Sequence, residues 1–135
     1  MRKPFFDPPI IAIDFDGTIA ENAYPELGDI KEEAKEFINF LKDEGIRVVI
    51  WTCRTNEEEV KEHLIKNGVH FDAFNNNDAI TNEEFEEYGF EDSRKIGADY
   101  VIDDRAIRFE DNWDEIHTNF KNAIKIWRKN ECQKE

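Results

Sequence analysis

The sequence predicts one α/β domain over residues 1–135, built as a Rossmann-like parallel sheet in a three-layer α/β/α arrangement. Three observations predict this fold. Short continuous apolar runs alternate along the chain with longer segments of helical periodicity. The longest apolar runs have the length of strands and are far too short to cross a bilayer. Strands separated by helices of ten or more residues pair in parallel, because the chain must cross over before it returns to the sheet.

The first predicted strand is the run from Pro9 to Phe15, whose continuous apolar character is typical of a strand buried on both faces. An irregular segment follows at 18–28. A helix is expected to begin at Asp29, with Glu32 as its capping-box partner, and to end at Gly45. This helix would cover one face of the sheet.

The second predicted strand runs from Ile46 to Trp51. Asn56 precedes three glutamates and is expected to cap a second helix, which Asn67 and Gly68 end. The segment from Val69 to Phe74 is the third predicted strand.

Thr81 and Glu84 form a capping-box pattern at the start of a short helix. The fourth strand is expected at Ala98 to Ile102, with a short fifth at Ala106 to Phe109. The last helix should run from about Asn112 to Lys129. Its apolar side chains share one face and are expected in the core: Trp113, Ile116, Phe120, Ile124 and Trp127.

Composition narrows the class of protein further. Lys plus Arg number 18 against 32 Asp plus Glu, which gives a formal charge of -14. Non-specific binding to nucleic acid or to an anionic membrane is therefore disfavoured, since both require a basic surface. Two cysteines form no disulfide framework, and no signal peptide or membrane span is evident, so a cytoplasmic location is expected.

Ligands of a parallel sheet bind beyond the carboxyl ends of its strands. Carboxylates are concentrated at these positions: Asp14 and Asp16 end the first strand, and Asp103 and Asp104 follow the fourth. Like charges in a partly dry crevice raise the free energy unless a cation neutralises them, and oxygen-only ligands favour Mg²⁺. The sequence therefore predicts a magnesium site at this edge.

Groups suited to a phosphoryl group are expected near the same edge. Thr52 offers a hydroxyl donor, and Arg54 and Lys95 offer positive charge. Arg94 stands next to Lys95, and either could be the inward cation. For Arg54 and Arg105 a structural ion pair is an open alternative to a role in the site.

Taken in order, these segments resemble the motifs of the haloacid dehalogenase superfamily of phosphohydrolases, from Ile10 to about Phe109. The segment from Asp14 to Thr18 matches the first motif, Thr52 resembles the second and Lys95 the third. Asp103 with Asp104 resembles the acidic pair of the fourth. The resemblance implies a phosphatase, because family dehalogenases lack an acid at the position of Asp16.

The resemblance also implies a role for each residue. Asp14 would be the nucleophile that forms an aspartyl-phosphate, and Asp16 the general acid and base. Thr52 would bind a phosphoryl oxygen, and Lys95 would offset negative charge. The metal ligands would be Asp103, Asp104 and Asp14, with the backbone carbonyl of Asp16.

Many family members screen the site with an inserted cap domain. Here the gap after the first motif is a short flap at about 18–28, and the later gap holds at most a small lid at about 78–92. The chain therefore resembles a capless member with an open site, which would accept a phosphorylated small molecule or a phosphorylated macromolecular end. The alternative is a phosphate-binding module without turnover, either a non-catalytic relative or a phosphoacceptor of the receiver kind.

Overall fold

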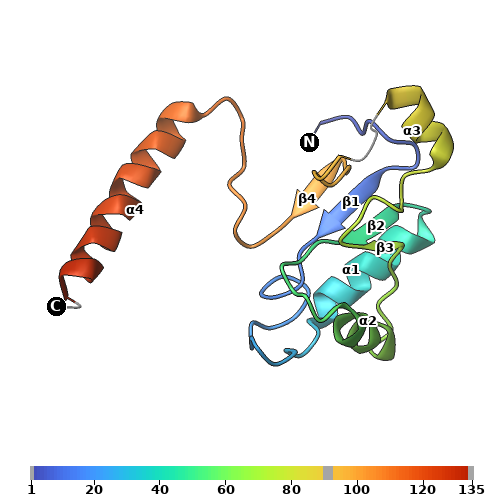
Figure 1. The fold of residues 1–135 in the computed structure, drawn as a ribbon, viewed down its shortest axis with the longest axis horizontal. Coiled ribbons are helices and arrows are strands. Elements are labelled where there is room, and N and C mark those ends of the chain that lie inside the picture. Colours follow the sequence, from blue (N-terminus) through green and yellow to red (C-terminus); the bar gives the residue numbers. More distant parts are fainter. Residues whose placement is uncertain (1, 90–92, 134–135) are drawn as a thin grey trace. The chain divides into compact units, whose positions relative to one another are not determined.

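The structure is a computed structural model that describes residues 2–89 and 93–133. The chain forms two compact units, residues 1–105 and residues 106–135 (Figure 1). The first unit holds a four-stranded parallel sheet in the order β3-β2-β1-β4. Its strands are β1 (Ile10–Ile13), β2 (Arg47–Ile50), β3 (Ala73–Phe74) and β4 (Tyr100–Ile102). The predicted α/β class with a parallel sheet is confirmed.

The two faces of β1 are both buried. Ile11 and Ile13 pack with side chains of α1 (Glu32–Asp43) and α2 (Glu57–Lys66), which lie together on one side of the sheet (Figure 1). Ile10 and Ala12 pack on the opposite face with side chains from the N-terminal segment and from residues 79–98, which include α3 (Asn82–Tyr88). Strand alternation therefore explains why the run reads as continuously apolar.

The N-termini of the helices match the predicted capping patterns only in part. The capping box of Thr81 and Glu84 at α3 is confirmed. The capping box predicted at Asp29 is wrong: α1 begins at Glu32 after the N-cap residue Lys31, because the backbone of residues 29–30 pairs with residues 20–21 at the base of the flap. Asn56 is the N-cap of α2, but its side chain donates to Glu59 instead of accepting a backbone N–H.

The third and fourth strands are shorter than predicted. Val69 donates its N–H to the carbonyl of Leu64 and therefore belongs to the C-terminal turn of α2. The Asp99 carboxylate accepts the backbone N–H of Ile10 at 2.8 Å, so a side chain continues the ladder where the fourth strand was expected to start. In the described part of the chain, residues 106–109 form no strand, and the fifth predicted strand is absent.

A partly buried ion pair joins α3 to the sheet. Arg47 on β2 meets Glu84 on α3 through two hydrogen bonds, of 2.6 and 2.9 Å. The Arg47 guanidinium lowers the pKa of Glu84 to about 2. This contact orients the segment between β3 and β4.

The second unit contains α4 (Trp113–Gln133). In the described part of this unit, α4 is accompanied by no second helix or strand against which its apolar stripe could pack. The burial of this stripe in the core stays a prediction. Among the described residues, no helix combines the length and the apolar character needed to span a membrane.

Candidate active site

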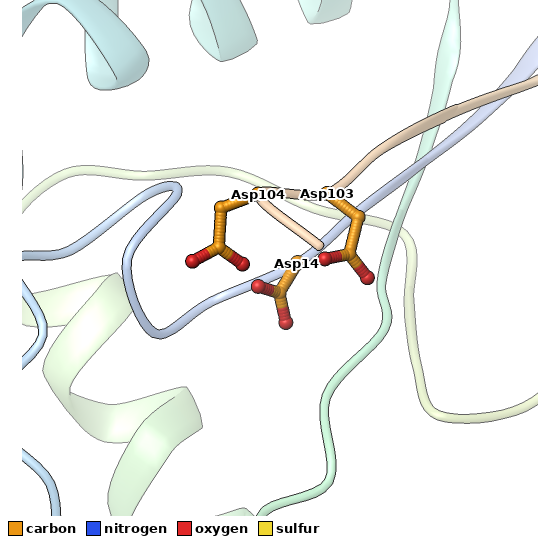
Figure 2. A group of neighbouring side chains, drawn as sticks. All are labelled: Asp14, Asp103 and Asp104. Atoms are coloured by element: carbon orange, nitrogen blue, oxygen red, sulfur yellow. The ribbon is translucent and has the colours of Figure 1, made fainter. Parts of the chain in front are cut away.

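Three carboxylates meet at the carboxyl ends of β1 and β4. Asp14 follows β1, and Asp103 and Asp104 follow β4; the N–H of Asp14 donates to the carbonyl of Ile102 at 2.9 Å and holds the two loops side by side. One carboxylate oxygen from each aspartate lies within 4.8 Å of the others. Figure 2 shows the three side chains gathered around a common point. The parallel register thus joins residues that lie about ninety positions apart in the chain.

The cluster has more negative charge than its surroundings compensate. The pKa of Asp14 rises from 3.8 to about 6, first because the carboxyl is partly buried and second because the Asp103 charge repels it. The Thr18 hydroxyl opposes this rise by donating to Asp14 Oδ2 at 3.2 Å. A cation at the meeting point would favour the ionised form of Asp14.

The turn after β1 brings Asp104 close to Asp14. Gly17 has a φ of +80°, which favours glycine, and a Cβ at this position would lie 2.6 Å from Asp104 Oδ2 and would force that carboxylate to move. The Thr18 hydroxyl donates to Asp14 and accepts the backbone N–H of Asp104 at 3.2 Å. Sequence reasoning gave Thr18 no role of its own, although its place in the first motif marked it.

The Asp16 side chain pairs with Arg54 and is not part of the three-carboxylate cluster. Arg54, which is 6% exposed, donates from Nε to Asp16 Oδ2 at 2.8 Å and from Nη2 to Asp16 Oδ1 at 2.6 Å. Between the two aspartates, Phe15 is fully buried in the core. The side chain predicted as a phosphate ligand is therefore engaged with a carboxylate.

Thr52 is held by Asn75, which sequence reasoning missed. Its backbone N–H donates to Asn75 Oδ1 and its carbonyl accepts from Asn75 Nδ2, each at 2.8 Å. Asn75 adopts a φ of 53°, a left-handed conformation that asparagine tolerates better than most residues. The Thr52 hydroxyl accepts the N–H of Arg54 at 3.2 Å, which leaves its own hydrogen available to a ligand.

Among the described residues, no hydrogen bond or ion pair joins the Lys95 side chain to the three carboxylates. It is exposed and lines a cavity of about 290 Å³ with Phe5 and Phe6, which precede β1. Arg94 lines a second cavity, of about 680 Å³, with Trp51 and Asn75, which follow β2 and β3. The two cavities share Asn77, Ser93 and Ile96 in their linings, so they do not select one of the two cations. Arg105 is exposed, and its backbone N–H donates to Asp103 Oδ1 at 2.9 Å.

A further cation contacts the turn. Lys31, the N-cap residue of α1, donates from Nζ to the carbonyl of Gly17 at 3.3 Å. Nothing in the local sequence around Lys31 marked it, because the contact spans the whole flap. It brings a positive charge to the backbone that follows Asp16.

Fold and site together define an α/β protein with an acidic cluster at the carboxyl edge of a parallel sheet. No family model and no curated protein matches the chain. A solved structure of a conserved protein from Bacteroides thetaiotaomicron is similar, with 36% sequence identity and a TM-score of 0.60. The match covers 85% of this chain and 91% of that one. At this identity and coverage, the chain belongs to the same family as that conserved protein.

Proposed function

We propose that the chain is a magnesium-dependent phosphatase of the haloacid dehalogenase type, which hydrolyses a phosphate monoester through an aspartyl-phosphate. The observation that carries the proposal is the convergence of Asp14, Asp103 and Asp104 at one edge of the sheet. The sequence resemblance assigns the same three residues to the nucleophile and its metal site. Two lines of reasoning that start from different observations therefore select one set of side chains.

The residues present fit a magnesium ion. Three carboxylates offer hard oxygen ligands, and burial together with the Asp103 charge raises the pKa of Asp14, which a bound cation would counteract. Asp14, Asp103 and Asp104 would hold the ion, with the backbone carbonyl of Asp16 as a further ligand. When bound, Mg²⁺ supplies positive charge that offsets the repulsion among the carboxylates and the negative charge of the phosphoryl group.

The chain's own groups account for both halves of the reaction. In the first half, an Asp14 carboxylate oxygen attacks phosphorus, the bond from phosphorus to the leaving oxygen breaks, and Asp16 gives that oxygen a proton. In the second half, Asp16 takes a proton from water as the water oxygen attacks phosphorus. The aspartyl-phosphate bond then breaks and releases phosphate, which regenerates the Asp14 carboxylate.

The surroundings of the site favour an open entrance. Between β3 and β4 the described residues contain the seven-residue helix α3, and the flap has no regular helix or strand longer than isolated bridges. Neither segment is long enough to form a cap with its own core. Thr52 would bind a phosphoryl oxygen beside the strand ends, with Arg94 or Lys95 as the cation, of which the resemblance favours Lys95. We therefore infer that the protein accepts a broad range of substrates, either phosphorylated small molecules or phosphorylated macromolecular ends. We also propose a cytoplasmic location.

A panel of phosphate esters assayed with Mg²⁺ and with excess chelator tests the proposal. Wild-type protein should release phosphate only with Mg²⁺, and Asp14→Asn should lose activity because an amide is not a nucleophile. Asp43→Asn, a change at an exposed carboxylate on the last residue of α1, is the matched control and should keep full activity. Turnover in excess chelator, or turnover by clean Asp14→Asn protein, would refute the assignment.

Acid quenching separates a phosphatase from the alternative without turnover. A phosphatase should yield a transient phosphoenzyme that hydroxylamine cleaves and that disappears as the ester is consumed. A phosphoacceptor module should instead accumulate one phosphate per chain and then stop. Absence of both labelling and turnover across the panel would favour a module that only binds phosphate.

A further inference from the structure

Arg54 is the buried charged side chain of the described part of the first unit, and its guanidinium donates four hydrogen bonds. Besides the two hydrogen bonds to Asp16, Nη1 donates to the carbonyl of Pro25 and Nη2 to the carbonyl of Glu26, each at 2.7 Å. Burying a charge raises the free energy unless it is fully paired, and two-point pairing with a carboxylate is the strongest form of such pairing. The position of this guanidinium is therefore closely determined.

The remaining contacts of Arg54 also involve the flap. The ring of Tyr24 lies 4.8 Å from the guanidinium carbon, and the ring of Phe15 lies 5.8 Å from it. Tyr24 is 72% exposed, so its ring covers the guanidinium from the solvent side while its neighbours Pro25 and Glu26 offer their carbonyls. Three consecutive flap residues thus meet at one side chain.

Four of the five N–H groups of Arg54 are used in these hydrogen bonds. A guanidinium that also bound the substrate phosphate would first have to give up contacts with Asp16 or with the flap. Its backbone N–H donates to the Thr52 hydroxyl within the loop after β2, while its side chain reaches Asp16 in the loop after β1. One residue therefore joins the general acid and base to the flap.

We propose that Arg54 is a positioning residue that couples the flap to the carboxylate of Asp16. With the flap closed on the guanidinium, each Asp16 oxygen accepts one of its N–H groups, and the carboxylate can change its orientation only after one of these hydrogen bonds is lost. Loss of that hydrogen bond loosens the guanidinium and, through it, the carbonyls of Pro25 and Glu26. Opening of the flap and release of Asp16 are thus one event. This inference rests on the proposed role of Asp16, but the coupling itself can be measured without turnover.

Hydrogen exchange of the flap tests the coupling directly. The N–H of Glu21 donates to the carbonyl of Asp29 at 2.9 Å and reports on closure at the base of the flap. In Asp16→Asn protein this N–H should exchange roughly tenfold faster, because the guanidinium loses its charged partner. Asp103→Asn is the matched control: it removes a charge from the same edge without touching Arg54, and flap exchange should stay within about twofold of wild type.

Kinetics of Arg54→Lys test the positioning role. Lysine keeps the charge but cannot bind a carboxylate at two points, so kcat should fall about tenfold with KM within about twofold of wild type. Exchange at Glu21 should rise in the same variant. An increase of KM at unchanged kcat would instead identify Arg54 as a phosphate ligand and overturn the proposal.

The two measurements fail independently. Unchanged flap exchange in Asp16→Asn protein would overturn the coupling, whether or not the protein is an enzyme. If no ester is hydrolysed by wild-type protein, the proposed function fails, while faster flap exchange in Asp16→Asn protein would still support the link between Asp16, Arg54 and the flap. Should Arg54→Lys fail to fold, the Asp16→Asn comparison alone decides the question.

Discussion

Replacing Asp14 by asparagine should stabilise the protein at neutral pH when a chelator removes divalent metal. The pKa of Asp14 is raised from 3.8 to about 6 by burial and by the charge of Asp103. A shift of about two units corresponds to about 3 kcal/mol between the two protonation states. Because Asp14 is only partly buried, solvent screening reduces the expected gain in the free energy of unfolding to about 1–2 kcal/mol.

The sign follows from proton binding. Folded wild-type protein binds a proton at Asp14 more tightly than the unfolded chain does, so its stability falls as the pH rises from about 4 to about 6. Asparagine does not titrate, and the variant lacks this loss. The advantage of Asp14→Asn should therefore vanish below about pH 4 and roughly double between about pH 5 and about pH 7.

Urea unfolding in the presence of chelator, repeated across this pH range, measures the difference. Asp43→Asn serves as the control and should shift the free energy of unfolding by less than about 0.5 kcal/mol at every pH. Saturating Mg²⁺ should reverse the order, because the wild type gains binding energy that Asp14→Asn lacks. A destabilised variant in chelator at neutral pH, or a difference independent of pH, would show that Asp14 does not experience the repulsion inferred from the cluster.

Three other changes test the turn, the metal and the packing of α3. Gly17→Ala should lower the free energy of unfolding by at least about 1 kcal/mol more than Gly45→Ala, as measured by urea, because both glycines have positive φ but only the Cβ at 17 would meet Asp104. It should also weaken Mg²⁺ binding in a titration, which Gly45→Ala should leave unchanged. Ca²⁺ should bind, as seen by a thermal shift, without supporting hydrolysis, since its longer and looser coordination misplaces the nucleophile; full activity with Ca²⁺ would contradict this. Glu84→Gln should cost about 1–2 kcal/mol at neutral pH by urea unfolding, and the cost should disappear as the pH falls from about 4.5 to about 2, where Glu84 loses its charge and its bond to Arg47; a cost that is unchanged at low pH would contradict the ion-pair explanation.

The parts of the fold that could be predicted from sequence are those set by burial on both faces of the sheet. The apolar runs that became β1 and β2 admit few alternatives, because every side chain in them except Arg47 is core-forming. The same pattern could not show that Asp99 replaces a backbone acceptor beside Ile10, since a side chain that bonds to the backbone leaves no periodic signal. The strand before Ile102 was therefore predicted too long.

In the candidate site, too, some features follow from the sequence and others do not. The position of Asp14, Asp103 and Asp104 follows from the rule that parallel strands bring their carboxyl ends to one edge, so topology alone assembles the cluster. The partner of Arg54 is a matter of side-chain direction across 38 positions of sequence, which neither spacing nor charge pattern determines. Lys95 was assigned by resemblance to a motif, and its role in the site stays a prediction; in the structure it lines the cavity that also contains Phe6.

Two carboxylates only two residues apart therefore meet opposite electrostatic conditions. Asp16 has its own cation, since the Arg54 guanidinium lies 2.6 Å from its Oδ1 and is shielded from water. Asp14 shares its surroundings with two other carboxylates and is the one whose pKa is raised. A divalent cation would relieve the repulsion at the Asp14 carboxylate and change little at the Asp16 carboxylate. Removal of metal should therefore affect the proposed nucleophile most. The proposed acid and base is instead paired with an arginine of the chain itself, which also contacts the flap. If both proposals hold, metal binding would govern the nucleophile and flap movement would govern the acid and base.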